Sequence, residues 1–389
     1  MKIVLIQDEI YLPSFAGGTK ANRCLLEGLA RDGHECLALT RALTSSSDGP
    51  RNLQQFTAEM KARGMSAEEA ESSVYSYRYE GVQVDALNFS DLDKRHDYLV
   101  RRIQAMNPDW IFVTDDKRRS MLPAALEASP SRVILLLQTI VQLPFGPLSV
   151  DKSSEYTRLV KAAQAIVVIS NFMKRYIHDH GNIDSYLLPI PVYGAGPFPD
   201  LARFDEGFVT MINPCELKGV SIFMGLAREF PDVKFAVVPT WGADQDLIGR
   251  LLELPNVSIL RPADDIEEIL GQTRILLAPS LWPETFGYVV PEAMLRGIPV
   301  LASDIGGLPE AKLGVDFVLP VVPGEFREDG FVSPPQDLSP WSQALGELLL
   351  DEDAYQRCSQ QSRQAARDFV ANVSVSRFEA LMNQLAEVR

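Results

Sequence analysis

Short apolar runs alternate with longer amphipathic segments along the first half of the chain. The segment 2–6 is apolar, and a loop containing Gly17-Gly18 separates it from a helical pattern that begins at Ala21 and ends at Gly33. Further apolar runs, rich in branched side chains, occur at 36–39, 82–87, 109–113, 132–137 and 165–169. Strands that are apolar on both faces and alternate with helices are typical of a parallel sheet covered on both sides. The pattern therefore predicts a doubly wound, Rossmann-like domain over 1–188.

A proline-rich segment interrupts this alternation at 189–206. Four prolines and two glycines fall within 188–199, and neither a helix interior nor a central strand tolerates that density of proline. The alternation then restarts, with apolar runs at 208–212, 234–238, 257–260, 275–278, 299–302 and 317–319. We therefore expect a linker and then a second Rossmann-like domain over 207–365. The predicted α/β fold has two such domains facing a cleft, and a C-terminal helix within 366–389 is expected to cross back to the first domain.

One segment departs from the alternation. Residues 45–76 are first rich in serine and then in charged side chains with a helical spacing. We expect an insertion there, mainly helical, that covers the first sheet. Farther on, Asp115-Asp116 follow an apolar run, and we expect them at the edge of the cleft.

Composition and charge limit the partners more than the fold. Apolar residues make up 46% and charged residues 23%, and no apolar run approaches the roughly 18 residues of a membrane-spanning helix. The net charge of −15 disfavours binding to nucleic acid and to anionic membranes. The four cysteines lack metal-binding spacing, and the first apolar run is too short for a signal peptide. We expect a cytoplasmic protein with no metal and no stable membrane insertion.

The segment 279–310 contains the candidate chemistry. An apolar run ends at Ala278, and Pro291 must lie in the first turn of the following helix because proline lacks an N–H. The helix is therefore expected to begin near Tyr288. The backbone N–H groups of Phe286, Gly287 and Tyr288 would then be free, which favours the binding of an anion such as a diphosphate.

Two acids flank this helix start. Glu284 precedes it and Glu292 lies in its first turns, eight positions later. Carboxylates repel a diphosphate, so these side chains are expected to face its neutral neighbours. Glu284 would accept hydrogen bonds from sugar hydroxyls, and Glu292 from the hydroxyls of a ribose. The bland alternative is that both acids only cap the helix.

The block resembles the E-x7-E motif of family 4 (group 1) glycosyltransferases, which are retaining enzymes of the GT-B fold. The matching residues are P-S, then E-T-F-G-Y-V-V-P-E, then G-I-P-V-L-A-S-D-I-G-G-L-P-E. Gly17-Gly18, the A-I-V-V-I-S sequence before Asn171 and Lys218-Gly219 match as well. The resemblance implies transfer of a hexose-type sugar from a nucleotide diphosphate sugar to a soluble hydroxyl acceptor. It implies a front-face mechanism without metal or cofactor, in which the departing phosphate accepts the acceptor's proton.

The resemblance also assigns roles to individual residues. The donor diphosphate would be held by Gly17, Gly18, Asn213, Lys218, Phe286, Gly287 and Tyr288. The sugar would contact Glu284, Thr285 and Phe286, and the ribose and base would contact Glu292, Arg261 and Ala263. Glu284, Gln138 and Thr139 are the candidates for the catalytic centre. The chain departs from the family at Asn213, where an arginine is usual, and at Gln138-Thr139, near which a histidine is usual.

Two other functions fit the same fold. One is a nucleotide-sugar 2-epimerase or a glycosyl phosphorylase, for which we find neither the pattern of acids and histidines nor a cofactor-binding lysine. The other is a partner protein that binds nucleotide sugar without turnover, which the departures at Asn213 and Gln138 favour. A donor assay separates them.

Overall fold

The computed structural model describes residues 1–44, 49–114, 118–328 and 330–387. The chain folds into two compact units. Unit 1 comprises Met1–Val192 together with the terminal segment from Val373, and unit 2 comprises Tyr193–Asn372. The described residues from 188 to 207 form neither helix nor strand, and the unit boundary lies among them.

Unit 1 is built on a sheet whose central strands follow the order β5-β2-β1-β6-β7-β8-β9. All neighbours in this series are parallel. The strands are β1 (Lys2–Ile10), β2 (Glu35–Arg41), β5 (Val82–Leu87), β6 (Trp110–Thr114), β7 (Val133–Leu137), β8 (Ala165–Val168) and β9 (Tyr186–Leu187). The chain leaves β1 toward one edge and returns to β6 on its other side, so the strand order reverses between β1 and β6. That point is where doubly wound folds bind ligands, at the carboxyl ends of the strands.

Helices cover both faces of this sheet, as the apolar strands predict. Gln7 of β1 contacts Asn22 of α1 (Gly17–Arg31), whereas the next residue, Asp8, contacts Arg95 of α3 (Leu92–Met106). Successive side chains of a strand point to opposite faces, so α1 and α3 lie on opposite sides. The remaining helices of the main body are α4 (Met121–Ala128), α5 (Ser154–Ala162) and α6 (Asn171–Gly181).

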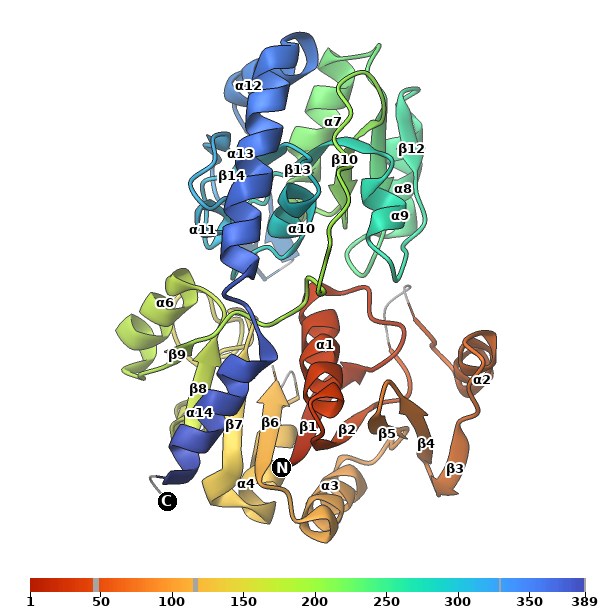
Figure 1. Cartoon of the computed structure of the whole chain (residues 1–389), viewed down its shortest axis with the longest axis vertical. Coiled ribbons are helices and arrows are strands. Elements are labelled where there is room, and N and C mark those ends of the chain that lie inside the picture. The colour runs from red at the N-terminus through yellow and green to blue at the C-terminus, as the bar shows by residue number, and fades with distance from the viewer. Residues whose placement is uncertain (45–48, 115–117, 329, 388–389) are drawn as a thin grey trace. The chain divides into compact units, whose positions relative to one another are not determined.

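The terminal helix α14 (Val375–Glu387) packs on the α1 face of unit 1 (Figure 1). Gly28 of α1 leaves room for Val375, whose Cγ2 lies 2.5 Å from the position a Cβ on that glycine would take. The rings of Phe378 and Phe112 meet edge to face at 6.3 Å between centroids. The segment 366–389 holds the end of α13 (Glu352–Val370) as well as α14, and a short break separates the two helices.

The prediction of a mainly helical insertion at 45–76 was wrong in part. A short helix, α2 (Leu53–Ala62), is present, but β3 (Glu68–Glu71) and β4 (Val74–Tyr79) follow and extend the sheet beyond β5 with antiparallel pairing. The four residues of β3 are all exposed and three are acidic, so the strand has no apolar signal. Charges on an edge strand discourage pairing with another chain. The aromatic, alternating sequence of β4 was the signal that could have revealed the hairpin.

The start of α1 also differs from the prediction. The helix begins at Gly17 rather than after Gly18, so both glycines lie in its first turn instead of in a loop. Helix assignment from spacing missed this turn because glycine has a low helix propensity.

Unit 2 contains a second doubly wound sheet, with strand order β12-β11-β10-β13-β14-β15. Every pair is parallel. The strands are β10 (Phe208–Ile212), β11 (Phe235–Val238), β12 (Val257–Ile259), β13 (Thr273–Ala278), β14 (Val300–Ser303) and β15 (Val318–Leu319). A hairpin of β16 (Glu325–Arg327) and β17 (Gly330–Val332) is separate from this sheet. The helices of the unit are α7 (Val220–Glu229), α8 (Gln245–Leu252), α9 (Glu267–Leu270), α10 (Val289–Leu295), α11 (Leu308–Ala311), α12 (Ser339–Leu350) and α13. The predicted fold class of two Rossmann-like domains is confirmed, and the strand order reverses here between β10 and β13.

A buried lysine lies in the core of unit 2. Lys312, directly after α11, is 0% exposed, and its ammonium donates to the carbonyl of Val300 at 2.6 Å. Burial lowers the pKa of Lys312 to about 8, while the thiol of Cys358 and the carboxylate of Asp316 act in the opposite direction.

We expect this lysine to make stability depend on pH. Between the pKa of about 8 in the folded state and the ordinary value of 10.5, the unfolded chain binds a proton that the folded chain does not. The free energy of unfolding should therefore rise by at most about 3 kcal/mol as the pH rises across that window. Below the window, Lys312 should make no pH-dependent contribution. Urea unfolding of the wild type and of Lys312→Met between pH 7 and 10 checks this. Equal pH slopes in the two proteins would contradict it.

Candidate functional site

The loop between β13 and α10 in unit 2 holds the first predicted acid, Glu284. The strand ends at Ala278, and α10 begins at Val289 with Tyr288 as its N-cap residue, close to the predicted start. Gly287 has a φ of +98°, and a Cβ there would lie 2.7 Å from Leu308 Cδ2. The positive φ favours glycine, and any larger residue would also displace the Leu308 side chain.

The Glu284 carboxylate is held by two side chains. Its Oε1 accepts hydrogen bonds from the Lys218 ammonium and from Ser280 Oγ, the latter at 2.9 Å. The side chains of Lys218 and Glu284 are 28% and 18% exposed, so the pair is accessible from one side. Lys218 follows β10 and Glu284 follows β13, and these neighbouring strands flank the point where the strand order reverses. The two residues, 66 positions apart, therefore meet at the ligand-binding edge of the sheet.

Sequence reasoning assigned no role to Ser280 or to Gly306-Gly307. Ser280 is buried and reaches Glu284, and its signal was the P-S pair before the turn. The Gly307 N–H donates to the Glu284 carbonyl at 2.7 Å. Gly306 has a φ of +66°, and a Cβ on it would lie 2.5 Å from the same carbonyl oxygen. The two glycines of the S-D-I-G-G sequence thus hold the backbone of Glu284.

Backbone donors line the same loop. In the described part of the chain, the N–H groups of Phe286, Gly287 and Val289 have no hydrogen-bond acceptor. The ring of Phe286 is 2% exposed and packs against Phe369 at 5.6 Å between centroids. The resemblance implies that Phe286 contacts the sugar. Because its ring is buried, such a contact would be made by its backbone.

Glu292 lies in the first turns of α10 and is 7% exposed. It is not a solvent-facing cap. The buried hydroxyl of Tyr193 has no hydrogen-bond partner among the described residues. Burial raises the pKa of Tyr193 well above its ordinary value, and the nearby Tyr288 and Glu292 add to this effect. The buried Glu292 carboxylate therefore acts electrostatically on a buried hydroxyl.

Asn213 occupies the position directly after β10. It has a φ of +59°, and its Oδ1 accepts a hydrogen bond from the Gly242 N–H at 2.9 Å. The side chain is 6% exposed, and its Nδ2 has no acceptor among the described residues. An unused buried donor is costly, by about 1–3 kcal/mol, unless a ligand satisfies it.

Two further residues end the neighbouring strands of unit 2. Arg261 follows β12 and is exposed, and its side chain makes no hydrogen bond or ion pair with any described residue. Ala263 beside it is half-buried. Trp241, which follows β11, is 48% exposed and was not singled out from the sequence. The signal available in the sequence was a tryptophan shortly after a predicted strand.

The unit 1 candidates form a group of their own. Gln138 follows β7 and is 6% exposed, and its Nε2 donates to Asn22 Oδ1 on α1 at 2.6 Å. A Cβ on Gly18 would lie 3.7 Å from Gln138 Oε1, so Gly18 and Gln138 are neighbours. Gly17 is the exposed first residue of α1. Asn22 thus fixes Gln138, a role that the sequence analysis missed.

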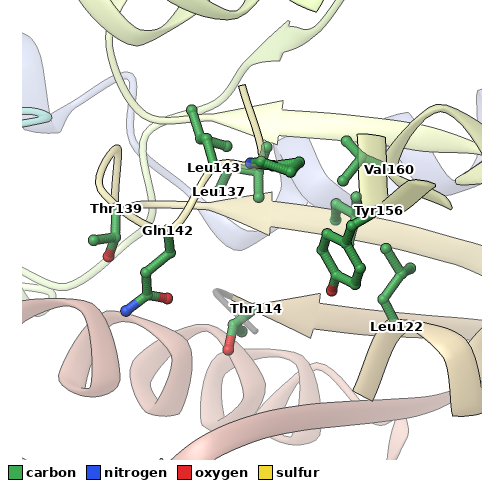
Figure 2. Close-up of a pocket in the computed structure, with 10 residues that line it drawn as sticks. Thr114, Leu122, Leu137, Thr139, Gln142, Leu143, Tyr156 and Val160 are labelled. Carbon is green, nitrogen blue, oxygen red and sulfur yellow. The ribbon is translucent and has the colours of Figure 1, made fainter. Parts of the chain in front are cut away.

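Thr139 lines a pocket at the carboxyl ends of β6 and β7. Figure 2 shows the Gln142 side chain between Thr139 and Thr114, while Leu122, Tyr156 and Val160 line the other end. Gln142 Oε1 has no hydrogen-bond donor among the described residues. Asp115 and Asp116, expected at the cleft edge, lie outside the described residues.

The described residues contain no group of three or more His, Cys, Asp or Glu side chains able to hold a metal ion. Among their helices, none combines the length and apolar character needed to cross a bilayer.

Parts of the chain are similar to known proteins. Residues 207–351 match the family model described as glycosyl transferases group 1, so unit 2 contains a group 1 glycosyltransferase domain. The exopolysaccharide phosphotransferase SCO2592 of Streptomyces coelicolor is 24% identical over 302 residues, which cover 74% of this chain and 30% of that protein. The D-inositol 3-phosphate glycosyltransferase of Mycobacteroides abscessus is 30% identical over 167 residues, covering 39% of this chain and 34% of that protein. The chain thus spans about a third of the length of these curated relatives.

Solved structures show the same fold. The sucrose-phosphate synthase of Thermosynechococcus elongatus superposes with a TM-score of 0.70 at 16% identity, covering 100% of both chains. HepE of Anabaena, in complex with UDP-glucose, gives 0.64 at 18% identity, covering 100% of this chain and 99% of that one. The fold is that of the GT-B glycosyltransferases.

Proposed function

We propose that the protein transfers a hexose-type sugar from a nucleoside diphosphate sugar to a hydroxyl-bearing acceptor. One observation carries the proposal: Lys218, Glu284 and Ser280 meet where the strand order of unit 2 reverses, inside the segment that matches the glycosyltransferase family. A cation and a carboxylate side by side suit a ligand that is anionic at one end and rich in hydroxyls at the other.

The anionic end is assigned to Lys218 and the loop amides. Lys218 supplies a point charge, and the unused N–H groups of Phe286, Gly287 and Val289 supply directed donors. The unused Nδ2 of Asn213 adds another, as a neutral substitute for the arginine that the family usually has. Charge that develops on the departing diphosphate is met by these groups, so the proposed reaction needs no metal.

The hydroxyl-rich end is assigned to Glu284 and Thr285. Without substrate, Glu284 is paired with Lys218. A diphosphate competes for the ammonium, and the released carboxylate then accepts hydrogen bonds from the sugar. Donor binding thereby prepares the sugar site, because one ion pair is exchanged for two charge-assisted contacts.

The nucleoside is assigned to the carboxyl ends of β10 to β12. Glu292 would accept hydrogen bonds from the ribose, and Arg261 and Ala263 would line the base. We add Trp241, whose exposed ring offers a stacking surface just after β11, the strand between β10 and β12. Gln138 and Thr139 of unit 1 would position the acceptor. Retention of configuration, through front-face transfer, and a cytoplasmic location complete the proposal.

A donor assay on the purified full chain tests this function. UDP-, GDP-, ADP- and TDP-hexoses are each incubated with the protein and a panel of hydroxyl acceptors, and released nucleotide is measured. UDP-glucose is the first choice because the similar HepE structure is a complex with it. We expect one donor to release nucleotide and form a glycosylated product. A donor retained intact would instead indicate a binding protein, and an altered sugar formed without acceptor would indicate an epimerase.

A further inference from the structure

Three arginine side chains surround one buried aspartate in unit 1. Asp8 of β1 is 3% exposed, and its Oδ1 accepts a hydrogen bond from Arg95 Nη1 at 2.9 Å. Arg41 Nη1 lies 4.0 Å from Oδ1, and Arg118 Nε lies 3.9 Å from Oδ2. The proposed sugar transfer assigns no role to any of these four side chains.

The aspartate does not account for all three cations. Arg95, itself 4% exposed, already neutralises Asp8 and hydrogen-bonds to it. Arg41 and Arg118 are too far away to donate to that carboxylate, and neither side chain makes a hydrogen bond with any other described residue. Arg95 Nε is a buried donor without an acceptor among the described residues, and Asp8 Oδ2 is a buried acceptor without a donor. One remaining carboxylate oxygen still faces three guanidinium groups. Guanidinium donors therefore outnumber the available acceptors.

Charge follows the same pattern. The lowered pKa of Arg41 is caused first by burial and next by the positive charge of Arg118, with Arg95 acting in the same direction. Asp8 and Glu9 oppose this effect without cancelling it. The four side chains thus carry three positive charges and one negative charge, and Glu9 adds a second negative charge that acts on Arg41. An anion placed between Arg41 and Arg118 would relieve the repulsion.

The cluster lies where a Rossmann-like unit binds its ligand. Arg41 is the last residue of β2, Asp8 lies near the end of β1, and Arg118 follows β6. These three strands are adjacent, and the strand order reverses between β1 and β6. The exposed fractions of the Arg41 and Arg118 side chains are 27% and 47%, whereas Arg95 and Asp8 are buried. The two free guanidinium groups are therefore the accessible part of the cluster.

We propose that Arg41 and Arg118 bind a phosphate group on the acceptor, so that the protein glycosylates a phosphorylated substrate rather than a neutral one. The role of the bound molecule as an acceptor depends on the proposed sugar transfer. The phosphate site itself depends only on the arginines. Planar guanidinium forks match the oxygens of a phosphate in pairs of hydrogen bonds. Arg95 pairs with Asp8, so the guanidinium groups of Arg41 and Arg118 are left to bind the ligand.

Inorganic phosphate is the first probe, measured by calorimetry on the full chain. The donor site is a second place where phosphate can bind, so every protein carries Lys218→Ala. In that background Arg41→Gln and Arg118→Gln are compared with Arg175→Gln, which removes an exposed arginine of α6 from the same unit. We expect the first two substitutions to weaken phosphate binding by about tenfold or more, and the third to leave it unchanged. Equal binding in all variants, or no binding before any arginine is replaced, would overturn the proposal.

Phosphorylated and neutral acceptors form the second arm. With an active donor, hexose 6-phosphates are compared with the same hexoses. Arg41→Gln and Arg118→Gln should raise KM for the phosphate esters about tenfold, with unchanged donor affinity and unchanged rates on neutral sugars. Equal use of ester and neutral sugar by the wild type would overturn the acceptor assignment. If no donor reacts at all, the sugar-transfer proposal fails, whereas the phosphate titration still decides the arginine site.

Discussion

Glu284→Ala should reduce sugar transfer by about a hundred- to a thousandfold while leaving the affinity for free nucleoside diphosphate equal to that of the wild type or higher. Turnover should fall while nucleotide affinity does not, because Glu284 pairs with Lys218 before the donor binds and with the sugar afterwards. In the substrate-free protein its carboxylate holds the Lys218 ammonium. Removing the carboxylate frees that ammonium for the diphosphate, but it also removes the acceptor proposed for the sugar hydroxyls in the transition state.

Turnover and calorimetric nucleotide affinity measure the two effects separately. The control is Glu352→Ala, which removes an exposed acid from α13 of the same unit. Far-ultraviolet circular dichroism and thermal unfolding establish that each variant is folded. Near-normal turnover in Glu284→Ala would exclude its role on the sugar. A loss of nucleotide affinity would show instead that Glu284 organises the diphosphate site.

Lys218→Ala should weaken binding of a nucleoside diphosphate by about ten- to a hundredfold and change nucleoside binding little. The lysine follows β10 at the edge where the strand order reverses, and its side chain is 28% exposed, so a phosphate can reach it. A compact cation contributes through charge, and a nucleoside has no charge for it to meet.

Titration with a matched nucleoside and nucleoside diphosphate measures this difference. Lys234→Ala is the control, because Lys234 is an exposed lysine of the same unit that precedes β11. Equal weakening of both ligands would mean that Lys218 supports the structure of the site rather than the phosphate. The double variant with Glu284→Ala adds a second check, since two residues in contact should show non-additive effects on diphosphate affinity.

Most of the fold could be predicted from the sequence because its signals are local. Apolar runs of strand length, the spacing of the helices and the dense prolines after Leu188 predict two doubly wound domains, and the strand orders confirm them. The failures have local reasons as well. The strand Glu68–Glu71 has four exposed residues and no apolar pattern, and Gly17-Gly18 lie in a helix despite their low propensity for it.

The sequence by itself also determined the loop that holds the first acid. Gly287 and Gly297 permit positive φ values, and Pro291 lacks a backbone N–H. These constraints follow from the residue types alone. The sequence therefore places Glu284 before α10 and Glu292 in its first turns. Their roles in a reaction remain predictions.

Only the tertiary structure decided which side chains meet. Lys218 pairs with Glu284 across 66 residues because β10 and β13 are neighbours, and that adjacency depends on strand order, which periodicity does not encode. The same holds for Asp8, around which the sheet and α3 gather arginines from three separate elements. A strand's apolar pattern determines that it is buried, but the packing of the whole sheet determines what stands beside its end.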